Sequence, residues 1–222
     1  VLLAADSRSG ALASGELIAT VALPPAVPWA VDADSAGLVL LAADGAITDA
    51  TAGEHLESVD PSRRLFTVAA TGASQPADVA RAFEFGALAT AAQLVGAGQT
   101  MLDMTVEYAK QRGQFGRLIG SYQAIKHKLA DVHIAVELAR PLIYGAALAL
   151  AERSPDAARD VSAAKAAAAD AALLSARAAL QTHGAIGYTT EHDLSQWLLR
   201  VQALRSAWGD PTFHRRRVLE AL

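Results

Sequence analysis

Residues 110–131 read KQRGQFGRLIGSYQAIKHKLAD and separate two long segments of helical periodicity. In 76–111 and again in 121–152, apolar residues recur every three or four positions, which indicates two amphipathic helices. A plain helix–helix turn needs one glycine and a polar residue. This stretch carries three glycines together with Arg112, Gln114, Phe115 and Gln123, and these extra residues indicate a surface shaped for a ligand.

The helical pattern continues to the C-terminus, with a third long helix expected over 157–183 and shorter ones over 190–206 and 211–221. Long helices of similar length with short connections predict a mainly α fold built as an antiparallel up-down bundle. The third helix is rich in alanine, which permits close approach of backbones. We therefore expect it in the packed centre of the bundle or in a subunit interface.

The first part of the chain, residues 1–75, differs in texture. Proline- and glycine-containing turns separate three β-prone runs, at 16–23, 37–43 and 64–70. These runs are too few for a complete sheet domain. The sequence thus predicts a small, incomplete β domain over 1–75 and a helical domain over 76–222, with Pro76 as the first helical residue.

Composition excludes several classes of protein. With 52% hydrophobic and 19% charged residues the chain is globular, and a net charge of −4 gives no basic surface for nucleic acid. It has no cysteine, which excludes disulfides and cysteine-ligated metals and suits the cytoplasm. Lys165, Asp170 and Arg177 interrupt the alanine-rich stretch, so we expect no membrane span. The histidines lack metal-ligand spacing, and His183 is interpreted as a packing residue whose polar atoms are satisfied.

The stretch RGQFGRLIGSYQAIKHKLAD resembles the signature of the acyl-CoA dehydrogenase family, which is Arg-x-x-Phe-Gly, then Phe, Tyr or His before Gln, then Leu-Ala-Asp. QTHGAIGYTTE at 181–191 resembles that family's Gln-x-x-Gly-Gly-x-Gly-Tyr followed by an acid. The resemblance covers about 76–222. It implies a C-terminal helical bundle that forms tetramers and helps to hold FAD across a subunit interface.

The resemblance also implies a set of cofactor-binding residues: Arg112, Gln114, Phe115, Ile119, Tyr122, Gln123, Gln181, Gly184 and Ala185. The planar, permanently charged fork of Arg112 would meet the FAD pyrophosphate. Phe115 and Gln123 would lie at the adenosine portion, and Gln181 and Gly184 would approach the pyrophosphate. Taken alone, Arg112 could instead neutralise the dipole at the end of its helix.

The family's reaction requires a glutamate base, which removes the α-proton of the acyl-CoA while a hydride moves to the flavin. The family places this glutamate at one of two positions, and this chain has Gly86 and Gly209 there. Glu84 and Asp210 lie nearby but out of register, and two residues along a helix turn a side chain by about 200°. No catalytic residue is therefore assigned.

Other departures point to a partner. Ala87 replaces an arginine that often contacts CoA in this family. The family's N-terminal helical domain has no counterpart in these 222 residues, either because the chain is reduced or because that segment lies outside the given sequence. The pattern resembles the non-catalytic subunit of actinobacterial heterotetrameric acyl-CoA dehydrogenases, which completes the FAD site of a homologous catalytic subunit. Many of these enzymes act on CoA thioesters of sterol side chains. Two alternatives stay open: a homo-oligomeric dehydrogenase or flavin oxidase with Asp210 or Glu84 as a displaced base, and a flavin-free helical scaffold.

Overall fold

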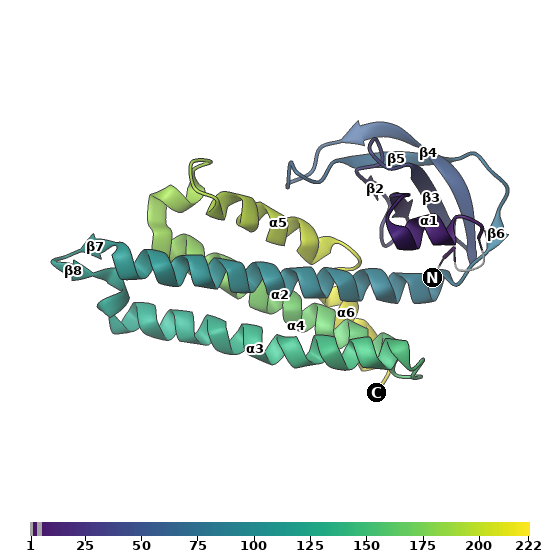
Figure 1. Cartoon of the computed structure of the whole chain (residues 1–222). Coiled ribbons are helices and arrows are strands. Elements are labelled where there is room, and N and C mark those ends of the chain that lie inside the picture. Colours follow the sequence, from purple (N-terminus) through teal and green to yellow (C-terminus); the bar gives the residue numbers. More distant parts are fainter. Residues whose placement is uncertain (1, 4–5) are drawn as a thin grey trace. The chain divides into compact units, whose positions relative to one another are not determined.

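The computed structural model describes residues 2–3 and 6–222, and the chain divides into two compact units, Val1–Gly86 and Ala87–Leu222. The first is a small sheet unit and the second is helical, so the mainly α fold preceded by an incomplete β region is confirmed (Figure 1). The division lies inside the long helix α2 (Val79–Gln111), later than the change of sequence texture at residue 76.

The sheet unit begins with the short helix α1 (Ser9–Ser14). Its strands are β1 (Ala19–Ala22), β2 (Ala30–Val31), β3 (Leu38–Ala43), β4 (Ala46–Leu56), β5 (Leu65–Ala70) and β6 (Gln75–Pro76). The strand order is β1-β3-β4-β5-β2, with β6 added beside β4. Only β1 and β3 pair in parallel among these neighbours, and the other described pairs are antiparallel.

The three predicted β-prone runs correspond to β1, β3 and β5, whereas the longest strand, β4, was not predicted. Only Ile47 of β4 is fully buried, and apolar and polar residues do not alternate regularly along the strand, so it lacks the apolar signal on which the prediction relied. The expectation that Pro76 begins a helix is wrong, because Pro76 pairs with Ala46 in β6. Helix α2 starts at Val79, where the carboxylate of Asp78 accepts the backbone N–H of Arg81 at 3.0 Å.

The helical unit follows the predicted order closely. After α2 come η1 (Ile119–Ser121), α3 (Gln123–Ala151), α4 (Ala157–His183), η2 (Gly184–Tyr188), α5 (Leu194–Ser206) and α6 (Pro211–Glu220). One cluster of buried side chains joins α2, α3, α4 and α5, so these helices share a single core. Short connections between long helices produce the antiparallel arrangement of Figure 1.

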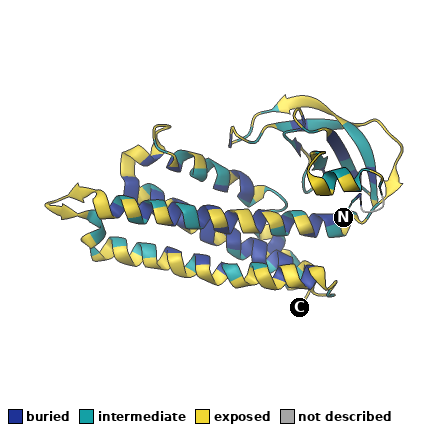
Figure 2. Ribbon diagram, viewed as in Figure 1, coloured by how far each residue is buried: buried dark blue, intermediate teal, exposed yellow. Residues whose placement is uncertain are grey.

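The alanine-rich helix α4 occupies the centre of this core (Figure 2). Its backbone approaches α2 so closely that a Cβ added to Gly98 would lie 3.5 Å from the Cα of Ala172. The hydroxyl of Ser175 on α4 donates to the Gly98 carbonyl at 2.7 Å. Of the two expected places for this helix, the packed centre is the observed one.

Helix α3 has an exposed apolar face (Figure 2). The exposed fractions are 55% for Ile134, 67% for Leu138, 43% for Leu142, 67% for Tyr144 and 59% for Leu148. Within the described residues α3 is long and apolar enough to cross a membrane, with a mean hydropathy of 1.5. Its other face packs into the bundle core, and Glu137 and Arg140 form an ion pair at mid-helix, which suits a protein neighbour better than lipid.

Candidate functional site

The quoted turn forms a β-hairpin at the end of α2, with β7 (Gly113–Gln114) paired to β8 (Arg117–Leu118) (Figure 1). Both residues at its tip have positive φ, 52° for Phe115 and 80° for Gly116, as in a type I′ turn. Positive φ is unusual for a bulky residue and often marks a functional constraint. The Phe115 side chain is 91% exposed, so the fold holds an aromatic ring in water in a strained conformation.

Local contacts fix this hairpin although it is exposed. The Tyr122 hydroxyl lies 3.3 Å from the carbonyl oxygens of both Gln114 and Phe115, to which it donates. The guanidinium of Arg117 covers the Tyr122 ring, with Cζ 3.9 Å from the ring centroid. At the base, a Cβ on Gly120 would lie 2.9 Å from the Ala109 carbonyl oxygen, so only glycine fits there. We call the Arg117–Tyr122 arrangement the hairpin clasp.

A cavity of about 510 Å³ opens beside the hairpin, between the start of α3 and the end of α4. Six of the predicted cofactor-binding residues line it: Arg112, Gln114, Phe115, Ile119, Tyr122 and Gln181. Five further lining residues were not predicted: Tyr108, Ala124, Ile125, Thr182 and His183. Gln123, Gly184 and Ala185 are not among the described lining residues. Gly184 instead caps α4, with φ 68° and its N–H donated to the Leu180 carbonyl.

The lining of the cavity is positively charged, because the described lining residues include Arg112 and no acidic residue. Within the part of the chain that the structure describes, the Arg112 guanidinium makes no hydrogen bond or ion pair. The oxygen of the Gln181 amide accepts a hydrogen bond from the ammonium of Lys128, which leaves the amide N–H groups as donors. Cationic and donor groups beside apolar side chains suit an anion attached to an organic body.

His183 contributes a buried polar atom to this wall. Its ring stacks on Tyr108 with centroids 4.3 Å apart and meets His192 edge-on at 4.8 Å. Nδ1 lies 2.9 Å from the Ala179 carbonyl and must donate to it, so in the neutral ring Nε2 carries no proton. Burial lowers the pKa of His183. His183 is buried, as predicted for a packing residue. The prediction that its polar atoms are all hydrogen-bonded is wrong, because Nε2 has no hydrogen-bond partner within the described residues.

The turn that contains Gly209 has no room for a side chain. Gly209 has φ 90°, and an added Cβ would lie 2.6 Å from Phe213 Cδ1 and 2.8 Å from His214 Nε2. Asp210 begins α6 as its N-cap, since its Oδ1 accepts the Phe213 N–H at 2.7 Å. Asp210 is thus committed to a structural bond, and Gly209 carries no carboxylate.

Two buried cationic or titratable side chains hold the same turn. The ammonium of Lys165, which is fully buried, donates to the carbonyl oxygens of Leu204, Arg205 and Gly209 at 3.1–3.2 Å. His214 Nε2 donates to the Trp208 carbonyl at 2.8 Å. Burial lowers the pKa of Lys165 to about 8 and that of His214 to about 4. These contacts brace the turn, and none of them creates a proton acceptor for a substrate.

The other candidate position lies in the first turns of α2. Gly86 offers no side chain, and Glu84 is 7% exposed, so its carboxylate is not presented on an open surface. Among the residues that the structure describes, no group of three or more potential metal ligands clusters together. The donor-lined cavity beside the hairpin is therefore the candidate site in the helical unit.

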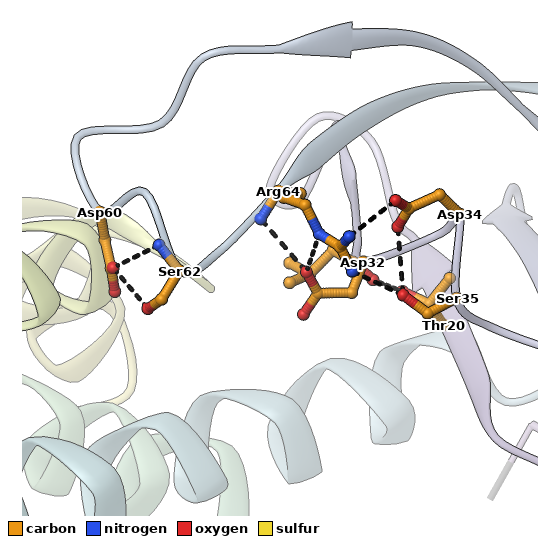
Figure 3. Close-up of polar contacts among 8 residues, drawn as sticks. Thr20, Asp32, Asp34, Ser35, Asp60, Ser62 and Arg64 are labelled. Carbon is orange, nitrogen blue, oxygen red and sulfur yellow. Dashed lines mark hydrogen bonds and ion pairs between the residues drawn. The ribbon is translucent and has the colours of Figure 1, made fainter.

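The sheet unit contains a separate cavity of about 640 Å³, lined in part by Thr20, Asp32 and Arg64 (Figure 3). Arg64 forms ion pairs with Asp32 at 3.3 Å and Asp34 at 2.8 Å, and donates to the Ser35 hydroxyl at 2.5 Å. These contacts within the sheet unit occupy the Arg64 guanidinium. This cluster acts as a surface brace between two loops of the sheet unit.

Comparison with known proteins identifies the class. Residues 77–222 match the model of the acyl-CoA dehydrogenase C-terminal domain. Acyl-CoA dehydrogenase IpdE2 from Mycobacterium tuberculosis is 33% identical over 192 residues, covering 86% of this chain and 58% of that protein. The ChsE4–ChsE5 complex from the same species matches with a TM-score of 0.81 and 26% identity, over 96% of this chain and 68% of that one. The structure of PigA with FAD and proline matches at 0.83 and 19% identity, over 97% and 70% of the two chains, and shows likeness of fold alone.

The chain therefore belongs to the acyl-CoA dehydrogenase family. Both motifs on which the resemblance rested lie within the matched residues. The chain spans about three fifths of the length of IpdE2, so the family is established for this segment. The likeness to actinobacterial members of the family is also confirmed.

Proposed function

We propose that this chain is the non-catalytic subunit of an FAD-dependent acyl-CoA dehydrogenase and completes the FAD site of a homologous catalytic subunit. The observation that carries the proposal is the contrast between two sites. The cavity beside the hairpin holds oriented donors and Arg112, which has no partner among the described residues, whereas Gly86 and Gly209 stand where a glutamate base belongs. Cofactor binding is retained and proton abstraction is lost.

The residues around the cavity fit the ADP half of FAD. Arg112 and Gln181 would hold the pyrophosphate, because both offer N–H donors and no acid in the described lining competes for them. Phe115, Ile119 and Tyr122 would flank the adenosine with apolar and aromatic surface. FAD, when bound, supplies the acceptor for the hydride of the substrate. This chain's residues bind and orient the cofactor, and the base that takes the α-proton comes from the partner.

The surface supports association with a related chain. The apolar face of α3 and the projecting Phe115 are exposed in the isolated chain, and exposed apolar patches of this kind mark partner contacts. We propose a homologous catalytic acyl-CoA dehydrogenase subunit as that partner, with a second copy of this chain as the alternative. The similar ChsE4–ChsE5 structure is a complex of two proteins, which supports the former. The substrate of the complex would be an acyl-CoA thioester, and we include sterol side-chain thioesters in that class.

The geometry weighs against the two alternatives. Asp210 is bound as a helix cap and Glu84 is buried, which disfavours either as a displaced base. The dipole of α2 alone could account for Arg112 in a flavin-free scaffold, but it gives no reason for the oriented Gln181 amide that lines the same cavity.

A dye-reduction assay with acyl-CoA tests the proposal. The chain alone should be inactive and its complex with a homologous acyl-CoA dehydrogenase should be active. In that complex, Asp210→Asn should leave turnover unchanged, since asparagine also caps helices. Turnover by the chain alone that disappears in Asp210→Asn or Glu84→Gln would show instead a self-sufficient dehydrogenase with a displaced base.

A further inference from the structure

The ammonium of Lys128 contacts the side chain of Gln181, 53 residues further along the chain. It sits in the first turns of α3, and Gln181 sits in the last turn of α4. Lys128 is not itself a lining residue, whereas Gln181 is. The contact therefore joins a residue outside the cavity to one that faces it.

The chemistry of this contact fixes what Gln181 can offer a ligand. A primary amide has one oxygen acceptor and an NH₂ group with two donors. The Lys128 ammonium has donors only and binds the amide oxygen, so the amide cannot turn its oxygen toward the cavity without losing a charge-assisted hydrogen bond. Gln181 consequently presents N–H groups.

The charges agree with that orientation. Arg112 lines the cavity with no partner within the described residues, and Lys128 adds a second positive charge in contact with the Gln181 amide oxygen. No carboxylate in the described lining could neutralise either. A ligand without acceptor atoms would leave these donors unpaired and a neutral acceptor would leave the charge uncompensated, whereas a phosphate-bearing ligand supplies both acceptors and negative charge.

We propose that Lys128 is a positioning residue, which orients the Gln181 amide so that its N–H groups donate to a phosphate oxygen of the bound dinucleotide. The inference rests on the proposed function and adds a residue to it. It also predicts a division of labour, because Lys128 should matter for the phosphates of the ligand and not for its adenosine.

The test compares the binding of ADP and of adenosine by calorimetry, on the purified chain and on its complex with a homologous subunit. Lys128→Met should weaken ADP binding about fivefold to tenfold and leave adenosine binding unchanged. Lys128→Arg should restore most of the ADP affinity, because it keeps the charge and the donors. Lys126→Met is the matched control. Lys126 is an exposed lysine two residues before Lys128, and its ammonium has no partner among the described residues.

The outcomes separate the inference from the function on which it rests. ADP binding that is equal with and without Lys128, or weakened as much by Lys126→Met, would overturn the role of Lys128 alone. An equal loss of ADP and adenosine binding would also overturn it, since that result indicates damage to the cavity. Failure of both the unchanged chain and its complex to bind ADP would contradict the proposed function itself.

Discussion

The guanidinium of Arg117 stacks on the ring of Tyr122, with Cζ 3.9 Å from the ring centroid. The hydroxyl of the same tyrosine donates to two carbonyl oxygens at the hairpin tip. The hairpin clasp of Arg117 and Tyr122 thus stabilises the positive-φ conformation of Phe115, while the Phe115 ring stays in solvent. Tyr122, predicted as a direct cofactor ligand, also has this structural task.

Removing the hydroxyl should loosen the hairpin without unfolding the bundle. In Tyr122→Phe the ring still stacks under Arg117, but the two carbonyls lose their donor, which costs about 1 kcal/mol locally. We expect faster amide exchange over residues 113–118, a severalfold weaker affinity for ADP, and an unchanged melting temperature. Tyr188→Phe is the control, because Tyr188 is 75% exposed. Unchanged exchange over the hairpin would argue that the hydroxyl contacts do not order it.

Restoring a glutamate at the lost position should fail. Gly209→Glu would force a side chain into contacts of 2.6–2.8 Å at a φ of 90°, so we expect a loss of about 3 kcal/mol or more in unfolding free energy. No dehydrogenase activity should appear in the chain alone. Gly145→Ala is the control, since Gly145 lies inside α3 with open space around it and should be neutral or slightly stabilising. A stable, active Gly209→Glu variant would show that the turn is adaptable.

His214 should make stability depend on pH in a defined window. Its pKa is lowered from an ordinary 6.5 to about 4 in the folded chain, because burial disfavours the charged ring. Above pH 6.5 both states are neutral at this site and nothing is lost. As the pH falls from 6.5 to 4 the unfolded chain binds a proton that the folded chain does not bind, so stability decreases, by about 3 kcal/mol at most from this group.

Urea unfolding at several pH values measures this dependence, with the unchanged chain and the His214→Gln variant compared. The variant should be less stable at pH 7, because it disturbs the bond to the Trp208 carbonyl, but its stability should fall less between pH 6.5 and 4. Parallel curves for the two proteins would mean that another group, such as His183, accounts for the pH dependence.

The exposed face of α3 should be required for assembly. Leu138 is 67% exposed in the isolated chain, so Leu138→Asp should leave the monomer's melting temperature almost unchanged. In a covered interface the same carboxylate would be buried without a partner, and the complex should dissociate. Light scattering after size-exclusion chromatography measures this. Gln202→Asp on the exposed side of α5 is the control and should assemble normally, and normal assembly of Leu138→Asp would place the interface elsewhere.

The helices and the hairpin motif were predictable because their signals are local. Apolar periodicity sets α2, α3 and α4 to within a few residues, and the Arg112–Gln123 motif lies within one connection. Strand β4 was missed because its exposed residues carry no apolar alternation. The Lys128–Gln181 bond and the crowding around Gly209 were out of reach, since both arise from residues brought together by the bundle.

Arg112 carries the positive charge of the cavity beside the hairpin, which we propose this chain contributes to a shared FAD site. The most direct measurement is the flavin content, by visible absorption, of the complex with a homologous acyl-CoA dehydrogenase subunit, with and without Arg112→Met. We predict flavin in the unchanged complex and at least a tenfold weaker retention of FAD in the variant. Arg177→Met, which removes an exposed arginine from α4, should retain flavin normally. Equal flavin content in all three complexes would contradict the claim that Arg112 holds the cofactor.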